Sequence, residues 1–174
     1  MEEFRKALSL ADKADVELLS SIYTSIGDNM YQQQLSDSSY VYYRKALQYN
    51  PGNMLALNNC AYHMAVEGKD LDEALHMIEK VMNEEKDNPT SLDTYAWVLF
   101  KRKDYAKARE IIDRTIELTD EADMSADVLE HAGDIYFMDG EPDMAVDFWK
   151  RAMKYDPDNE LLQRKVRHKT YFFK

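Results

Sequence analysis

The chain has 174 residues, 45% of them hydrophobic and 32% charged, so it is long enough to bury the core of one good-sized domain. Five glycines and four prolines are few for strand-and-turn architecture, whereas the many Ala, Leu, Met, Glu and Lys residues favour helices. The formal charge of -11 argues against general nucleic-acid binding, which needs a positive surface. We therefore expect an all-α chain with no nucleic-acid partner.

The amino-terminal residues MEEFRKALSLADKAD are acidic and amphipathic, and they lack the apolar run of a signal peptide. No stretch approaches the ~20 apolar residues that cross a bilayer, so we expect a soluble chain without direct membrane insertion. The compartment is left open between the cytoplasm and, for a fragment of an exported protein, the cell envelope. The single cysteine, Cys60, forms no internal disulfide and implies no redox compartment.

Small residues recur along the chain at a nearly constant spacing. Gly27, Ala61, Ala96 and Gly133 are separated by 34, 35 and 37 residues. Around each of them, apolar residues three and four positions apart predict two antiparallel helices joined by a short polar turn. Two helix axes approach to ~8 Å only where the side chains at the crossing are short. These four positions therefore predict close helix crossings.

The first and fourth units share a set of small, aromatic and proline positions: Tyr23, Ile26, Gly27, Met30, Ser39, Tyr43, Ala46 and Pro51 in the first, and Leu129, Ala132, Gly133, Tyr136, Ala145, Trp149, Ala152 and Pro157 in the fourth. This pattern resembles the tetratricopeptide repeat, in the style of bacterial members of that family. The resemblance implies a right-handed α-solenoid of helix-turn-helix repeats. The middle units depart from the pattern at Cys60, Val81, Lys86, Thr115 and Asp120.

The resemblance extends over nearly the whole chain, and we expect residues 1–174 to form a single domain. Residues 4–12 resemble the second helix of an earlier repeat, which indicates the C-terminal part of a longer array. Residues 160–174 lack the small residues of the repeat and are polar on one face, which is typical of a capping helix. The four full repeats are expected at residues 20–53, 54–88, 89–122 and 126–159.

In this family the first helix of each repeat lines a concave groove, which implies that residues just before and just after the small position face a ligand. Aromatic side chains at such places are typical anchors of a peptide site, and carboxylates favour Lys or Arg on the ligand. We therefore expect a protein or peptide partner with apolar and basic residues. The candidate peptide-binding residues are Asp28, Tyr31, Asn58, Tyr62, Asp93, Trp97, Phe100, Glu130, Asp134 and Phe137.

Other interpretations of the same residues stay open. Phe100 and Phe137 can instead pack under a neighbouring repeat or under the C-terminal helix. The basic segment Leu161–Lys174, with five Lys or Arg and no acidic residue, either packs against the acidic body or attracts an acidic partner. The whole chain can also be a C-terminal spacer or self-association module of a larger, enzymatic or membrane-anchored protein, with the groove empty or filled by another copy.

No pattern in the sequence points to catalysis, a metal or a cofactor. The four histidines are scattered, and Gly-rich phosphate loops, Gly-x-Ser-x-Gly elbows and paired zinc motifs are absent. The carboxylate clamp of chaperone-binding family members needs Lys, Asn, Lys and Arg where this chain has Thr24, Asp28, Thr90 and Thr94, and only Asn59 in the second unit matches the clamp. We therefore expect a non-catalytic scaffold or adaptor that does not bind acidic C-terminal tails.

Overall fold

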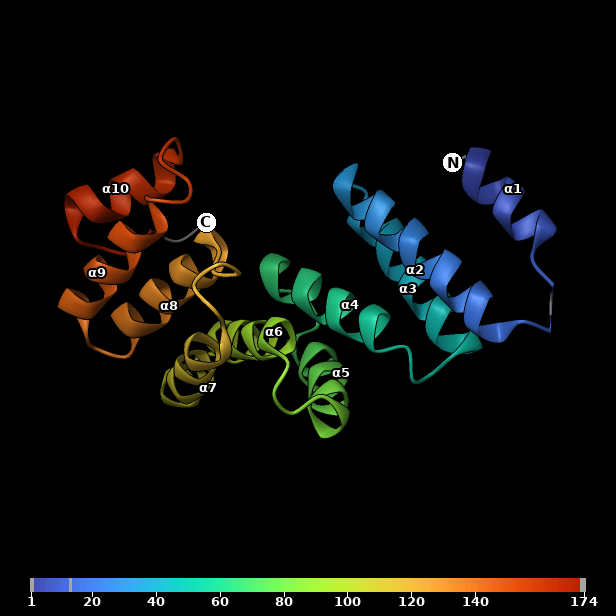
Figure 1. Cartoon of the computed structure of the whole chain (residues 1–174), viewed down its shortest axis with the longest axis horizontal. Helices are drawn as coiled ribbons and strands as arrows, with labels where there is room; N and C mark the ends of the chain where they lie inside the picture. Colours follow the sequence, from blue (N-terminus) through green and yellow to red (C-terminus); the bar gives the residue numbers. More distant parts are fainter. Residues whose placement is uncertain (1, 13, 173–174) are drawn as a thin grey trace. The chain divides into compact units, whose positions relative to one another are not determined.

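The computed structural model describes residues 2–12 and 14–172 (Figure 1). Every regular element within these residues is a helix, which confirms the all-α prediction. None of these helices combines the length and the apolar character that crossing a bilayer requires. The helices are α1 (Glu2–Leu10), α2 (Val16–Gln32), α3 (Ser36–Tyr49), α4 (Met54–Glu67), α5 (Leu71–Glu84), α6 (Pro89–Lys101), α7 (Tyr105–Leu118), α8 (Ala126–Met138), α9 (Pro142–Ala152) and α10 (Glu160–His168).

The chain divides into two compact units, Met1–Val81 and Met82–Lys174. The first unit contains α1 to α4 and most of α5, and the second contains the end of α5 and α6 to α10. Each unit is described by itself below. The single domain and the repeat boundaries expected from the sequence stay predictions.

Polar caps fix where the first helix of a repeat begins. The side chains of Asn53, Asn88 and Ser125 each accept a hydrogen bond from a backbone N–H in the first turn of the helix that follows, α4, α6 and α8 respectively. Asn159 does the same for α10. Such caps accept hydrogen bonds from backbone N–H groups that otherwise have no partner at the start of a helix. They therefore fix the residue at which each helix begins.

The turns between the first and second helices of the four repeats all close in the same way. Each contains a residue with positive φ, which is Gly140 in the last repeat but Gln34 and Lys103 in two others. A backbone N–H after this turn bonds back to a carbonyl in the last turn of the first helix. These bonds run from Leu35 to Met30, from Lys69 to Met64, from Asp104 to Leu99 and from Glu141 to Tyr136, at 2.9 to 3.0 Å.

The predicted close crossings are confirmed at both glycines. A Cβ atom placed on Gly27 would lie 2.7 Å from Cε1 of Tyr43, and one placed on Gly133 would lie 2.3 Å from Cδ1 of Trp149. Both aromatic rings are fully buried. The glycines therefore create the space in which the large ring of the second helix packs against the first helix.

The first unit has an apolar core that includes Tyr23, Ile26 and Met30 of α2. Phe4 and Leu8 of α1 pack against this core, as expected of a helix that resembles the second half of a repeat. Cys60 on α4 is fully buried, and burial raises the pKa of its thiol to about 12. The thiol is therefore neutral and shielded in the folded unit.

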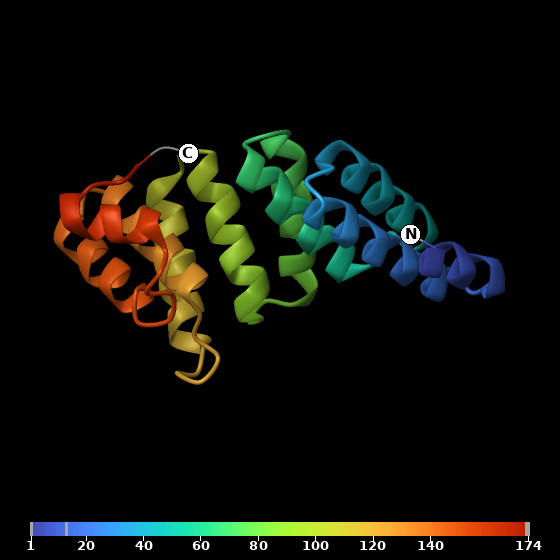
Figure 2. The same ribbon diagram turned by 90° about the horizontal axis from the view of Figure 1, so that it is seen from above.

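The C-terminal helix is shorter than the sequence predicted. α10 ends at His168, because Lys169 adopts a left-handed conformation with φ 49° and residues 170–172 follow without helical structure. Residues 173–174, the last two of the expected capping helix, lie outside the described residues. α10 packs against α9, and its Leu162 is fully buried; Figure 2 shows the two helices side by side.

Candidate functional site

The candidate residues fall into two groups, one in each unit. We call Asp28, Tyr31, Asn58 and Tyr62, on α2 and α4, the first inner face. The second inner face lies on α6 and α8 and consists of Asp93, Trp97, Phe100, Glu130, Asp134 and Phe137.

Asp28 joins three helices of the first unit. Its Oδ1 accepts hydrogen bonds from the hydroxyl of Tyr43 on α3 at 2.6 Å and from Nδ2 of Asn59 on α4 at 3.0 Å. Burial and the hydrogen bond to Asp28 raise the pKa of Tyr43, so its hydroxyl stays protonated and donates. Asp28 therefore holds the helices together as well as lying on the first inner face.

Tyr31 stacks on His63, with ring centroids 3.5 Å apart and planes 16° from parallel. Burial lowers the pKa of His63 to about 4, although the carboxylates of Asp28 and Glu67 oppose the shift. The imidazole is therefore neutral near pH 7, and its buried Nδ1 has no hydrogen-bond partner among the described residues. Tyr31 is half-buried, so part of its surface stays exposed beside this stack.

Asn58 carries an unsatisfied buried acceptor. Its Nδ2 donates to Oδ1 of Asn59 at 3.3 Å, but its own Oδ1 has no hydrogen-bond partner among the described residues. Only 9% of Asn58 is exposed. A buried acceptor without a partner costs about 1 to 3 kcal/mol, so such a group calls for an explanation. Tyr62, one turn further along α4, is half-buried.

The helices that carry the first inner face contain no Lys or Arg. Their charged residues are Glu17 and Asp28 on α2 and Glu67 on α4, all acidic. Glu67 forms an ion pair with Lys69 in the turn after α4, at 3.0 Å. The two helices therefore present acceptors and negative charge, which favour a ligand that brings donors or cations.

Trp97 lies within an aromatic stack in the second unit. Its ring stacks on Phe100 at 4.8 Å and on His131 at 4.0 Å, with interplanar angles of 11° and 19°. The sequence suggested exposed anchors, but the structure leaves only 8% of Trp97 and 5% of Phe100 exposed. The indole Nε1 of Trp97 is buried and has no hydrogen-bond partner among the described residues.

Asp93 is engaged by His131. Nδ1 of His131 lies 3.0 Å from Oδ1 and 3.1 Å from Oδ2 of Asp93. Burial alone lowers the pKa of His131, but the charge of Asp93 and the hydrogen bond to it outweigh burial, so the pKa is raised above its ordinary value. The pair is therefore close to a neutral unit when His131 is protonated.

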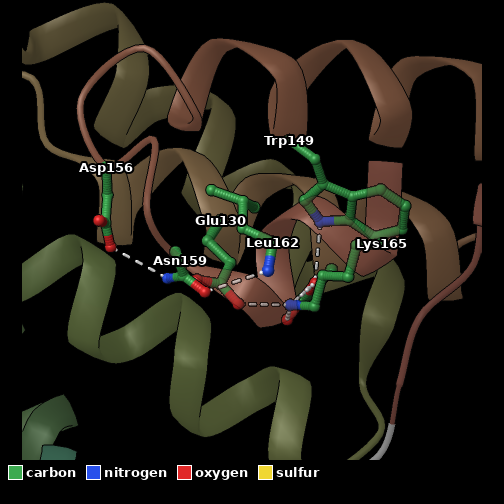
Figure 3. A network of polar contacts seen from close by, with 7 residues as sticks. Glu130, Trp149, Asp156, Asn159, Leu162 and Lys165 are labelled. Atoms are coloured by element: carbon green, nitrogen blue, oxygen red, sulfur yellow. Dashed lines mark hydrogen bonds and ion pairs between the residues drawn. The ribbon is translucent and has the colours of Figure 1, made fainter. Parts of the chain in front are cut away.

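Glu130 and Asp134 hold the ammonium group of Lys165, which comes from α10 (Figure 3). Nζ of Lys165 lies 2.6 Å from Glu130 Oε1 and 2.6 and 2.7 Å from the two oxygens of Asp134. Nε1 of Trp149 also donates to Asp134 Oδ1, at 2.9 Å. Burial raises the pKa of Asp134, and Lys165 opposes that shift. With Lys165 only 1% exposed, the cation is part of the core.

The sequence assigned a cation from a ligand to Glu130 and Asp134, whereas in the structure the chain supplies that cation itself. The remaining aromatics also contact their own chain: Phe137 lies 5.7 Å from the ring of Trp149, and Phe100 lies 5.8 Å from that of Tyr171. The contact of Phe100 with the C-terminal segment is one of the alternatives that the sequence left open.

Three residues outside the candidate set share one position in the repeat. Asn59 and His131 lie two residues before the small position of their repeats, and Lys165 lies six residues into α10, as Asn59 does in α4. Each contacts the helix two elements earlier in the chain, through Asp28 on α2, Asp93 on α6 or Asp134 on α8. The common position is a signal that the sequence contained but that was not used.

A family model described as "Tetratricopeptide repeat" matches residues 65–126 of the chain. The chain has the fold of a tetratricopeptide repeat protein. The match covers residues from the end of α4 to the first residue of α8. A search of curated proteins gave no match.

Solved structures of tetratricopeptide repeat proteins have the same fold. PilF of Pseudomonas aeruginosa is 18% identical, with a TM-score of 0.72 over 88% of this chain and 68% of that one. A protein from Parabacteroides merdae is also 18% identical, with a TM-score of 0.69 over 97% and 71%. YrrB, described as having "an unusual peptide-binding site", is 20% identical, with a TM-score of 0.66 over 95% and 81%. Tetratricopeptide repeats generally serve as protein-interaction scaffolds.

Proposed function

We propose that the chain is a non-catalytic interaction scaffold that binds a peptide segment or helix of a partner protein on its first inner face. The observation that carries the proposal is the buried Oδ1 of Asn58, which lacks a hydrogen-bond partner among the described residues. A backbone N–H or a Lys or Arg side chain of a ligand would satisfy this acceptor. Binding would then recover the free energy that the unsatisfied group costs in the unbound chain.

The surroundings of Asn58 support a ligand of this chemistry. Tyr31 and Tyr62 are half-buried and offer apolar ring surface with a polar hydroxyl, a combination that is frequent at protein interfaces. The absence of Lys and Arg from α2 and α4 favours a basic residue on the ligand. The partner segment therefore combines an apolar side chain, a basic side chain and accessible backbone donors.

The second inner face does not share this role in the proposal. Asp93 already has His131, and Glu130 and Asp134 already have Lys165. These carboxylates are therefore compensated before any partner binds. The primary ligand contacts are assigned to Asp28, Tyr31, Asn58 and Tyr62.

The test compares two single variants of the chain used as bait in affinity capture from the source cell. Asn58→Ala removes the unsatisfied acceptor, and the control Val41→Ala changes an outward-facing residue of α3 that is 60% exposed. We expect Asn58→Ala to fold at least as stably as the wild type, because it removes an uncompensated polar group. We also expect it to bind the captured partner at least about tenfold more weakly, which corresponds to about 1.4 kcal/mol.

The outcomes separate the alternatives. Equal affinity of the wild type, Asn58→Ala and Val41→Ala for the partner would rule out the first inner face as the site. If no variant captures a partner and the mass in solution doubles with concentration, the spacer or self-association interpretation replaces the scaffold. Circular dichroism of each variant checks that a lost partner is not a consequence of unfolding.

A further inference from the structure

The connection between α7 and α8 is longer than the two that join the earlier full repeats. It runs over seven residues, 119–125, whereas residues 50–53 and 85–88 join the earlier repeats with four residues each. Together with the end of α9, this connection lines a pocket of about 400 Å³, a volume typical of ligand sites. The pocket is therefore a feature of the second unit that the repeat pattern does not require.

The pocket lies away from the second inner face, because its lining comes from the second helices of two repeats and from the segments that follow them. α7 and the connection contribute the apolar residues Ile116 and Met124 and the carboxylate of Glu121. Arg151 of α9, followed by Lys154 and Tyr155, contributes two cations and an aromatic ring.

The two cations of the lining are not compensated within the chain. Arg151 and Lys154 form no ion pair with a carboxylate of residues 2–12 and 14–172, whereas the neighbouring Lys150 lies 3.7 Å from Asp147. The guanidinium of Arg151 lies 5.3 Å from the ring centre of Phe148, a cation–π contact that leaves its N–H donors available. With Glu121 as the one carboxylate, the lining has a net positive charge on a chain whose formal charge is -11.

The exposure of the lining favours a segment of a protein over a small molecule. Arg151, Lys154 and Glu121 are exposed, and Tyr155 is 48% exposed. Sites for small molecules bury most of the ligand, which this open lining does not. Successive side chains of an extended peptide point to opposite sides, so alternating acidic and apolar residues can face the end of α9 and α7 respectively.

We propose that this pocket binds an acidic peptide segment of a partner protein, in which Asp or Glu alternates with aliphatic residues. Arg151 and Lys154 bind the carboxylates, Ile116 and Met124 contact the aliphatic side chains, and Glu121 weakens the binding by repulsion. The proposed function assigns a basic ligand to the first inner face, so this site adds a partner of the opposite charge. The two sites share no residue and lie in different units, and each can fail alone.

The test measures binding of the fluorescent peptide LELELE to the full chain. The peptide LQLQLQ keeps the leucines without the charges, and SESESE keeps the carboxylates without the apolar side chains. We expect both to bind at least about tenfold more weakly than LELELE, because the site uses charge and apolar contact together. Raising the salt concentration is expected to weaken the binding of LELELE, because the two cations are exposed.

Two double variants of equal charge decide whether the pocket or the general surface is responsible. Arg151→Gln with Lys154→Gln is expected to bind LELELE at least about tenfold more weakly than the wild type. The control Lys150→Gln with Arg167→Gln removes the same charge from exposed residues outside the lining, and is expected to change the affinity less than about twofold. Glu121→Gln is expected to bind LELELE more tightly than the wild type, because a like charge is removed.

No binding of LELELE to the wild type, or an equal loss in the two double variants, would overturn the proposal. Circular dichroism checks that each variant is folded, and a measurement on the unchanged chain covers a variant that is not. Excess LELELE is expected to slow hydrogen exchange of the amides in residues 119–125, and unchanged exchange there would also contradict the proposal. Asn58→Ala is expected to bind LELELE like the wild type, so a failure of this site and a failure of the first inner face are distinguishable.

Discussion

Asp28 and Asp134 occupy the same place in their repeats, yet the two units use them differently. Each follows a glycine of a first helix and accepts a hydrogen bond from the large aromatic residue of the second helix, which is Tyr43 in one case and Trp149 in the other. In the first unit the following helix adds a neutral amide, from Asn59. In the second unit the following helix adds a charged ammonium group.

The same repeat position therefore holds a carboxylate beside a neutral amide in one unit and beside a positive charge in the other. The neutral amide of Asn59 leaves the charge of Asp28 uncompensated, so the first unit keeps an acidic inner face. Lys165 compensates Asp134 and Glu130 together and draws all three charges into the core. The neutral contact therefore leaves the negative charge of the first inner face in place, whereas the buried cation neutralises that of Glu130 and Asp134 within the chain.

The largest expected effect comes from removing the cation. Lys165→Met leaves two buried carboxylates without a partner and is expected to lower the free energy of unfolding by about 3 to 5 kcal/mol. The equivalent change in the first unit, Asn59→Leu, is expected to cost about 1 kcal/mol, because Asp28 keeps the hydroxyl of Tyr43. Urea unfolding followed by circular dichroism measures both.

The tryptophans give that measurement a local readout, since Trp97 and Trp149, the only two, both lie in the second unit. Their fluorescence is expected to respond to Lys165→Met and not to Asn59→Leu. Adding Glu130→Gln and Asp134→Asn to Lys165→Met is expected to recover part of the loss. A cost below about 1 kcal/mol for Lys165→Met would contradict the view that its ion pairs hold the unit together.

The next largest loss of stability is expected from replacing the two glycines at the helix crossings. Gly133→Ala forces a methyl group to within 2.3 Å of the buried Trp149, whereas Gly27→Ala meets Tyr43 at 2.7 Å. Overpacking costs about 1 to 3 kcal/mol, less the roughly 1 kcal/mol by which Ala favours a helix over Gly. We expect Gly133→Ala to lower the melting temperature more than Gly27→Ala. The reverse order would show that the indole of Trp149 moves aside more easily than the ring of Tyr43.

The two units are also expected to respond to pH with opposite signs. The pKa of His63 is lowered to about 4 in the folded state, so the stability that its neutral form contributes is present above its unfolded pKa, about 6.5, and is lost as pH falls. Burial lowers the pKa of His131, but Asp93, with smaller contributions from Asp134 and Asp127, raises it by more. The net effect is a raised pKa. The stability that His131 contributes is therefore present below pH ~6.5 and is lost as pH rises through the folded pKa.

The variants His63→Gln and His131→Gln separate these contributions. Relative to the wild type, His63→Gln is expected to gain roughly 1 to 2 kcal/mol on going from about pH 8 to about pH 5, after an allowance for solvent screening. His131→Gln is expected to lose stability over the same change, because the raised pKa of His131 contributes stability only at the lower pH. Urea unfolding at both pH values gives the comparison, and shifts of the same sign for the two variants would contradict it.

The smallest expected effect concerns the aromatic donor to Asp28. Tyr43→Phe removes the hydroxyl that bonds to Asp28 and keeps the packing of the ring over Gly27. Because Asn59 remains as a donor, we expect a loss of about 1 kcal/mol, measured by urea unfolding. A loss above about 3 kcal/mol would mean that Asn59 does not support Asp28 by itself.

The sequence was a good guide wherever one repeat determines the structure. Gly27 and Gly133 marked the helix crossings because the small side chain and the large ring that covers it lie in one helical pair, at a fixed spacing. The same periodicity placed Asp28 and Asp134 at equivalent positions. The fold could be predicted from such local spacing, because each unit repeats the same contacts.

The candidate site could be predicted less well, because its contacts come from other repeats. Trp97 is buried by His131 of the following repeat, which the repeat pattern does not require. The sequence showed a basic C-terminal segment but could not indicate which lysine would reach Glu130. The return of Tyr171 to Phe100 depends on the left-handed conformation of Lys169, a residue type that rarely adopts it.

The buried thiol of Cys60 allows the opening of the first unit to be measured separately from that of the second. It is the only cysteine in the chain and lies in the first unit, fully buried and with its pKa raised to about 12. A thiol-specific reagent can therefore modify the chain only when the structure around α4 opens, because reaction requires an accessible thiolate. The labelling rate reports the opening of residues 1–81, while tryptophan fluorescence reports on residues 82–174, and neither measurement needs a substitution in the chain.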